Sequence, residues 1–67
     1  DMRDSVVHHS LPRPETVRGK HGRELLAFLY GCGVDTIDLG PGEALTIHRV
    51  ARLACHHGWR RNHRLVD

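Results

Sequence analysis

The stretch from Ala44 to Arg64 constrains the fold of this 67-residue chain more than any other. Its apolar residues recur at the i, i+3, i+4 and i+7 positions of one helix face: Ile47, Val50, Ala51 and Ala54. Gly58 then predicts the end of the helix, because glycine readily adopts the left-handed conformation that closes many helices. We therefore expect an amphipathic helix that covers a small core, with Trp59 folded back onto that core.

A shorter apolar pattern predicts a first helix that starts at Thr16 or Gly22 and ends at Tyr30. Its apolar side is supplied by four residues: Leu25, Leu26, Phe28 and Leu29. Either Gly31 or Gly33 is suited to close this helix.

Strand signals lie on both sides of this first helix. Residues 34–39 alternate apolar and polar side chains, and Gly40-Pro41-Gly42 predicts a turn directly after them. Residues 5–8 contain two adjacent β-branched valines and predict a short first strand, and residues 64–66 are a candidate for a last one.

The order of these elements predicts an α+β fold, with two helices packed on one face of a small two- or three-stranded sheet. Residues 1–15 are expected to form an arm, linker or first strand, and residues 16–67 a single small domain. The chain begins at Asp1 rather than methionine. We therefore expect a longer parent protein, whose other domains are candidate partners.

Small size and residue spacing argue against several functions. A chain of 67 residues encloses too little core for a deep substrate pocket, so an independent enzyme is not expected. The cysteines and histidines lack the paired spacing of structural zinc sites, and no metal or other cofactor is predicted. Cys55 is interpreted as a small buried residue, and both it and Cys32 as reduced thiols of an intracellular protein. No run approaches the roughly 18 apolar residues of a membrane span.

Positive charge gathers in the stretch that also forms the second helix. Residues 44–66 carry five arginines and no acid, whereas residues 24–43 carry four acids and no base. Such segregation indicates a polyanionic partner, because arginine donors match phosphate oxygens and a tryptophan face can stack on an unpaired base. The residues predicted to contact nucleic acid are Arg49, Arg52, Arg60, Arg61 and Arg64 for phosphate, His48, His56 and His63 as lesser contacts, and Trp59 as a stacking residue.

About 40 residues of the chain, from Glu24 to Arg64, resemble an R3H domain, a small module that binds single-stranded nucleic acid. The resemblance rests on Phe28-Leu29 at the end of a helix, on the strand and turn Ile37-Asp38-Leu39-Gly40-Pro41, and on Leu53-Ala54-Cys55-His56-His57-Gly58-Trp59. The Arg-x-x-x-His pair of that family is absent, because Ile47 and Ala51 occupy its positions when the chains are aligned through Gly58. The chain is thus similar to a divergent R3H-like domain, which implies a preference for single strands.

Two other interpretations stay open. Residues 45–54 resemble the first helix of a bacterial helix-turn-helix repressor, with Cys55, His56 and His57 in place of the usual Gly-Val-Ser turn. A degenerate helix-turn-helix DNA binder is therefore one alternative. The other is a protein-interaction or scaffold domain of a larger assembly, in which the acidic stretch from Glu24 to Glu43 and the basic helix contact complementary proteins.

Overall fold

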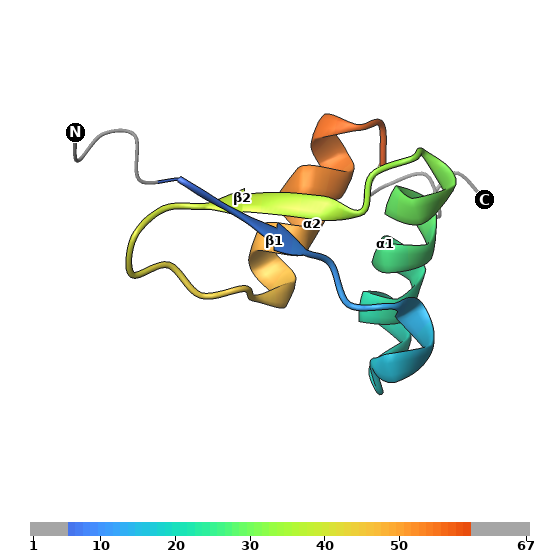
Figure 1. Ribbon diagram of the computed structural model, residues 1–67. Helices are drawn as coiled ribbons and strands as arrows, with labels where there is room; N and C mark the ends of the chain where they lie inside the picture. The colour runs from blue at the N-terminus through green and yellow to red at the C-terminus, as the bar shows by residue number, and fades with distance from the viewer. Residues whose placement is uncertain (1–5, 60–67) are drawn as a thin grey trace.

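The computed structural model describes residues 6–59, which form an α+β fold. In chain order the elements are strand β1 (Val7–Ser10), the 3-10 turn η2 (Pro14–Thr16), helix α1 (Lys20–Gly31), strand β2 (Thr36–Leu39) and helix α2 (Ile47–His56) (Figure 1). The predicted fold class is confirmed, with two helices beside a two-stranded antiparallel sheet. The candidate strand at residues 64–66 lies outside the described residues.

The sheet is a short antiparallel pair with one buried face. Val7 lies opposite Leu39, and Ser10 lies opposite Thr36. Residues of β2 alternate between exposed and buried, whereas all of β1 is exposed. In Figure 1, α2 passes behind the strands and α1 stands beside one end of the sheet. Both strands begin two residues later than predicted. The turn at Gly40 ends the ladder at the pair Val7 and Leu39, and the ladder reaches only as far as the pair Ser10 and Thr36.

The core is almost entirely aliphatic. Its buried members are Leu11, Leu25, Leu26, Leu29, Ile37, Leu39, Val50 and Ala54. Among residues 6–59 no polar or charged side chain is buried. Leu25 and Leu29 are fully inaccessible, so helix α1 supplies the centre of the core.

The two helices lie side by side and run in the same direction (Figure 1). Near their N-terminal ends, Gly22 of α1 faces Ile47 of α2: a Cβ placed on Gly22 would lie 3.2 Å from Ile47 Cδ1. At their C-terminal ends, the rings of Phe28 and Trp59 meet edge to face with centroids 5.3 Å apart. The missing side chain of Gly22 therefore allows the close approach of the two helices.

Both helices end in a Schellman motif closed by glycine. After α1, Gly33 (φ 84°) donates its N–H to the Tyr30 carbonyl, and Val34 donates to the Leu29 carbonyl. After α2, Gly58 (φ 110°) and Trp59 repeat the pattern on the carbonyls of Cys55 and Ala54. Gly33 is thus the closing residue of the first helix, and the predicted end of the second helix at Gly58 is confirmed.

The helix starts differ from the prediction. Thr46 is the N-cap of α2, since its hydroxyl accepts the Arg49 N–H at 3.2 Å. Glu43 therefore lies in the turn that precedes α2, outside the first helical turn. Helix α1 begins at Lys20, because Thr16 belongs to the separate turn η2.

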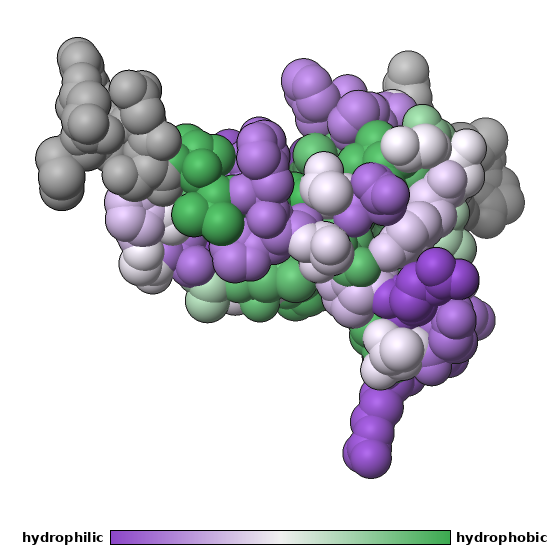
Figure 2. Space-filling view, viewed as in Figure 1, coloured by the Kyte–Doolittle hydropathy of each residue, from purple (hydrophilic) through white to green (hydrophobic). Residues whose placement is uncertain are grey.

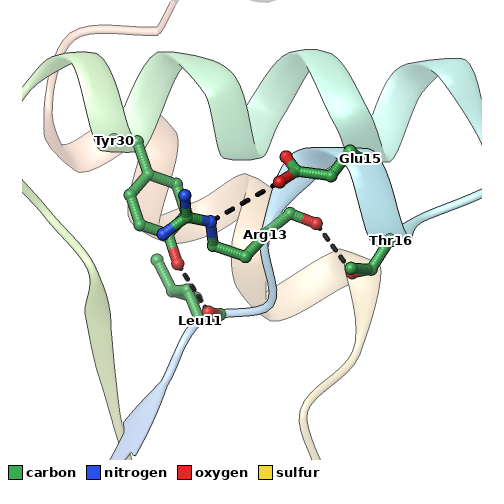
Figure 3. A network of polar contacts seen from close by, with 5 residues as sticks. All are labelled: Leu11, Arg13, Glu15, Thr16 and Tyr30. Carbon is green, nitrogen blue, oxygen red and sulfur yellow. Dashed lines mark hydrogen bonds and ion pairs between the residues drawn. The ribbon is translucent and has the colours of Figure 1, made fainter.

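A polar network fastens the connection between β1 and α1 to the side of that helix (Figure 3). The Tyr30 hydroxyl donates to the Leu11 carbonyl at 2.6 Å, and the guanidinium of Arg13 lies 5.8 Å from the centre of the tyrosine ring. Arg13 also pairs with Glu15 at 3.7 Å, and its carbonyl accepts the Thr16 hydroxyl at 2.7 Å. The network fixes Leu11 where its side chain enters the core.

Apolar side chains are also found on the surface. Four large ones are well exposed: Val6, Val7, Leu45 and Ile47. In the space-filling view, hydrophobic surface appears at the start of β1 and below the strand pair, and hydrophilic surface covers the N-terminal end of α1 (Figure 2).

Candidate functional site

A groove of about 560 Å³ separates the two helices on one side of the molecule. It is lined by His21 and Glu24 of α1, by His48, Ala51, Arg52 and Cys55 of α2, and by Trp59. We call it the interhelical groove. Its size lies within the range of small-ligand sites.

Helix periodicity explains which side chains reach this groove. His48, Arg52 and Cys55 follow an i, i+4, i+7 spacing on α2, next to the buried stripe of Val50 and Ala54. Cys55 is consequently exposed on the groove wall, and its interpretation as a buried residue is wrong. Cys32 is also exposed, and the two thiols form no disulfide.

Trp59 is the aromatic residue of the interhelical groove. The Schellman motif after α2 turns the chain back, and the half-buried indole packs against Phe28 at an interplanar angle of 67°. The prediction that Trp59 folds onto the core is confirmed. Because Trp59 also lines the groove, it combines a packing role with contact to any occupant.

A second groove, of about 490 Å³, runs between α2 and β2. It is lined by Val34, Thr36, Ile37, Asp38, Leu39, Arg49, Arg52, Leu53 and His57. We call it the strand-edge groove. Arg52 lines both grooves, so it lies on the ridge of α2 that separates them.

The charge of Arg49 is shared with an acid of the turn before α2. Its Nη1 lies 3.2 Å from Glu43 Oε2, while Glu43 Oε1 accepts the Gly40 N–H at 2.6 Å. The Gly40 N–H lowers the pKa of Glu43 below its ordinary value; burial opposes this effect, and the nearby Arg49 guanidinium lowers the pKa further. Arg49 is therefore less available to a phosphate than Arg52.

We expect Glu43→Gln to destabilise the fold more at neutral pH than at acidic pH. A carboxylate whose pKa is lowered by folding stabilises the native state above its unfolded pKa, and this stabilisation is lost as the pH falls through the folded pKa. Thermal unfolding of both proteins between about pH 7 and pH 2.5 measures the difference, which should shrink below the ordinary Glu pKa of about 4.3. Arg49→Gln should reproduce only part of this pH-dependent loss of stability. A difference in stability between Glu43→Gln and the unmodified chain that stays constant across this pH range would contradict the prediction.

Within residues 6–59, the predicted contact residues other than His56 are divided between the two grooves, which share Arg52. His48, Arg52 and Trp59 meet in the interhelical groove, whereas Arg49 and Arg52 share the strand-edge groove. His56 lines neither groove, and its ring lies edge to face with His57 at 5.2 Å. The remaining predicted residues, Arg60, Arg61, His63 and Arg64, lie outside the described residues.

Two groove residues, His21 and Glu24, were not predicted to belong to a site. They are three positions apart on α1 and so lie on one side of that helix. Their spacing was visible in the sequence. Their proximity to His48 and Arg52 depends on the contact between Gly22 and Ile47, which no periodic pattern reveals.

Within residues 6–59, no three His, Cys, Asp or Glu side chains lie close enough together to hold a metal ion. None of the described helices is both long and apolar enough to cross a membrane.

Comparison with family models, characterised proteins and solved structures gives no significant match to this chain. The R3H-like resemblance therefore stays a prediction from residue spacing.

Proposed function

We propose that this chain is a nucleic-acid-binding module that holds a single strand along α2, with one nucleotide in the interhelical groove. The observation that carries the proposal is the meeting of His21, His48 and Arg52 from two helices beside the indole of Trp59. Such a groove offers cationic and hydrogen-bonding side chains for a phosphate and an aromatic surface for a base.

The one acid of this groove also fits the proposal. Glu24 of α1 lines the groove together with His48 and Arg52 of α2, and its carboxylate would repel a phosphate placed beside it. A carboxylate can instead accept a hydrogen bond from the exocyclic amino group of a base. We therefore expect the phosphate near Arg52 and the base edge near Glu24.

A single strand suits the groove better than a duplex does. Bases of a single strand expose their faces and pairing edges, and so one base can enter a groove of about 560 Å³. The R3H-like resemblance of residues 24–64 independently favours single strands. A helix-turn-helix mode would need a recognition helix after Trp59, where the chain lies outside the described residues.

The test is a salt titration of binding by fluorescence anisotropy, with labelled single-stranded RNA, single-stranded DNA and a duplex of the same sequence. We expect single strands to bind best, with log K falling linearly against log salt at a slope of about −0.7 per phosphate contact. Failure to bind any oligonucleotide at the lowest salt would overturn the proposal. Preference for the duplex would instead favour the helix-turn-helix alternative.

A further inference from the structure

We infer that the strand-edge groove is a strand-addition site for an extended acidic peptide segment of a partner protein. This function goes beyond nucleic-acid binding and uses the other side of α2. Three features carry the inference: the free backbone groups of β2, a stripe of side chains on α2, and the charge of that stripe.

The free edge of β2 follows from the register of the sheet. The Leu11 N–H donates to the Asp35 carbonyl at 2.8 Å, which identifies these two residues as a hydrogen-bonded pair. Because such pairs alternate along an antiparallel ladder, Ile37 and Leu39 also point their backbone groups toward β1. The N–H and C=O groups of Thr36 and Asp38 therefore point away from β1.

This edge has a defined length. Gly40 would continue the row, but its N–H already binds Glu43 Oε1 at 2.6 Å and its carbonyl accepts the Glu43 N–H at 3.1 Å. Among residues 6–59, β2 pairs only with β1, and the outward groups of Thr36 and Asp38 have no strand beside them. Two donors and two acceptors are thus available to an added strand, the arrangement on which strand-addition sites depend.

Helix α2 supplies the opposite wall of the groove. Arg49, Leu53 and His57 recur at i+4 spacing and line the groove as one stripe, with the half-buried Leu53 at its centre. Alternate side chains of an added strand would face this wall, so an apolar one would pack on Leu53 while the side chains two positions before and after it reach the basic ends of the stripe.

Charge selects an acidic peptide over other occupants. Arg52 supplies the charge of this wall together with His57 and with Arg49, which shares its charge with Glu43, while the carboxylate of Asp38 is engaged by His8 across the strands. A second copy of the chain would bring two basic α2 helices together, and like charges disfavour that pairing. A nucleic acid lacks the alternating N–H and C=O groups that would pair with all four backbone groups along this edge.

The test is an NMR titration of the ¹⁵N-labelled full chain with acetylated Glu-Thr-Val-Thr-Glu, which places Glu, Val and Glu on one face, and, as a matched control, acetylated Lys-Thr-Val-Thr-Lys. We expect the acidic peptide to shift the Thr36 and Asp38 amides and to slow their hydrogen exchange, while the basic peptide has little effect. Equal binding of both peptides would overturn the inference. So would protection of these two amides in the free chain, because the edge would already be occupied.

A backbone variant separates strand addition from simple charge attraction. Thr36 is the first residue of β2 and its N–H points outward, so Thr36→Pro removes a donor without breaking the ladder. We expect about fivefold weaker binding of the acidic peptide for one lost hydrogen bond, and unchanged binding by Thr36→Ala. Equal binding by both variants would overturn the inference, as would oligonucleotide shifts confined to the same two amides. If the unmodified chain binds the acidic peptide but no oligonucleotide, the proposed function is overturned and this inference stands.

Discussion

Replacing Leu25 with alanine is expected to remove most of the stability of this chain. Leu25 is fully inaccessible and lies at the centre of the aliphatic core, so the substitution removes buried methyl groups and leaves a cavity. Such changes destabilise proteins by about 3–5 kcal/mol. A chain of 67 residues is expected to have only about 3–10 kcal/mol in total. Urea unfolding followed by circular dichroism should therefore show a midpoint about 3 M lower, or no folded baseline, for a slope near 1 kcal/mol/M.

Leu45→Ala is the matched control for this prediction. It removes the same atoms from a leucine that retains 37% of its exposure and lies before α2. Its effect should stay below about 1 kcal/mol. Alanine has a high helix propensity, so loss of helix in Leu25→Ala would reflect lost packing and not a poor helix former. Equal effects of the two substitutions would mean that α1 does not supply the centre of the core.

Local chemistry made the helix ends predictable. Gly33 and Gly58 take positive φ values that other residues rarely adopt, and Trp59 follows the second of these glycines as the apolar residue of the motif. The turn between strand and helix was equally clear, because Gly42 (φ 79°) follows Pro41 and the Glu43 N–H bonds back to Gly40. Each of these features depends on a few adjacent residues.

The helix starts and the grooves depended on contacts between distant residues. Thr46 is the N-cap of α2, whereas Glu43 is engaged by Gly40 and Arg49. His21 joined the interhelical groove only because α1 and α2 approach closely at Gly22. Arg49 was predicted as a free phosphate contact because the stretch after Ala44 lacks acids, yet its partner Glu43 lies just before that stretch. Spacing therefore predicted which helix face is basic, but not how its charges are shared.

Arg52→Glu, on the basic face of α2, is expected to weaken binding of a single-stranded oligonucleotide at least about tenfold at low salt. Arg52 is exposed on the ridge between the two grooves and has no ion pair with an acid of residues 6–59. Reversal of its charge replaces an attraction for phosphate by a repulsion, and the loss of one phosphate contact should also reduce the salt slope by about 0.7. Because salt screens exposed charges, the two proteins should bind with converging affinity as salt rises.

Arg18→Glu is the control that separates a local contact from total charge. It changes the net charge by the same amount, but Arg18 is exposed near the start of α1 and lines neither groove. We expect the affinity of Arg18→Glu for the oligonucleotide to change less than about threefold, because one distant exposed charge has only a weak, screened effect. Equal loss of affinity in both variants would mean that binding follows net charge and not the interhelical groove.

His21→Ala separates the two proposed binding sites, because His21 lines only the interhelical groove. If this variant weakens oligonucleotide binding and leaves binding of the acidic peptide unchanged, the two faces of α2 bind different partners.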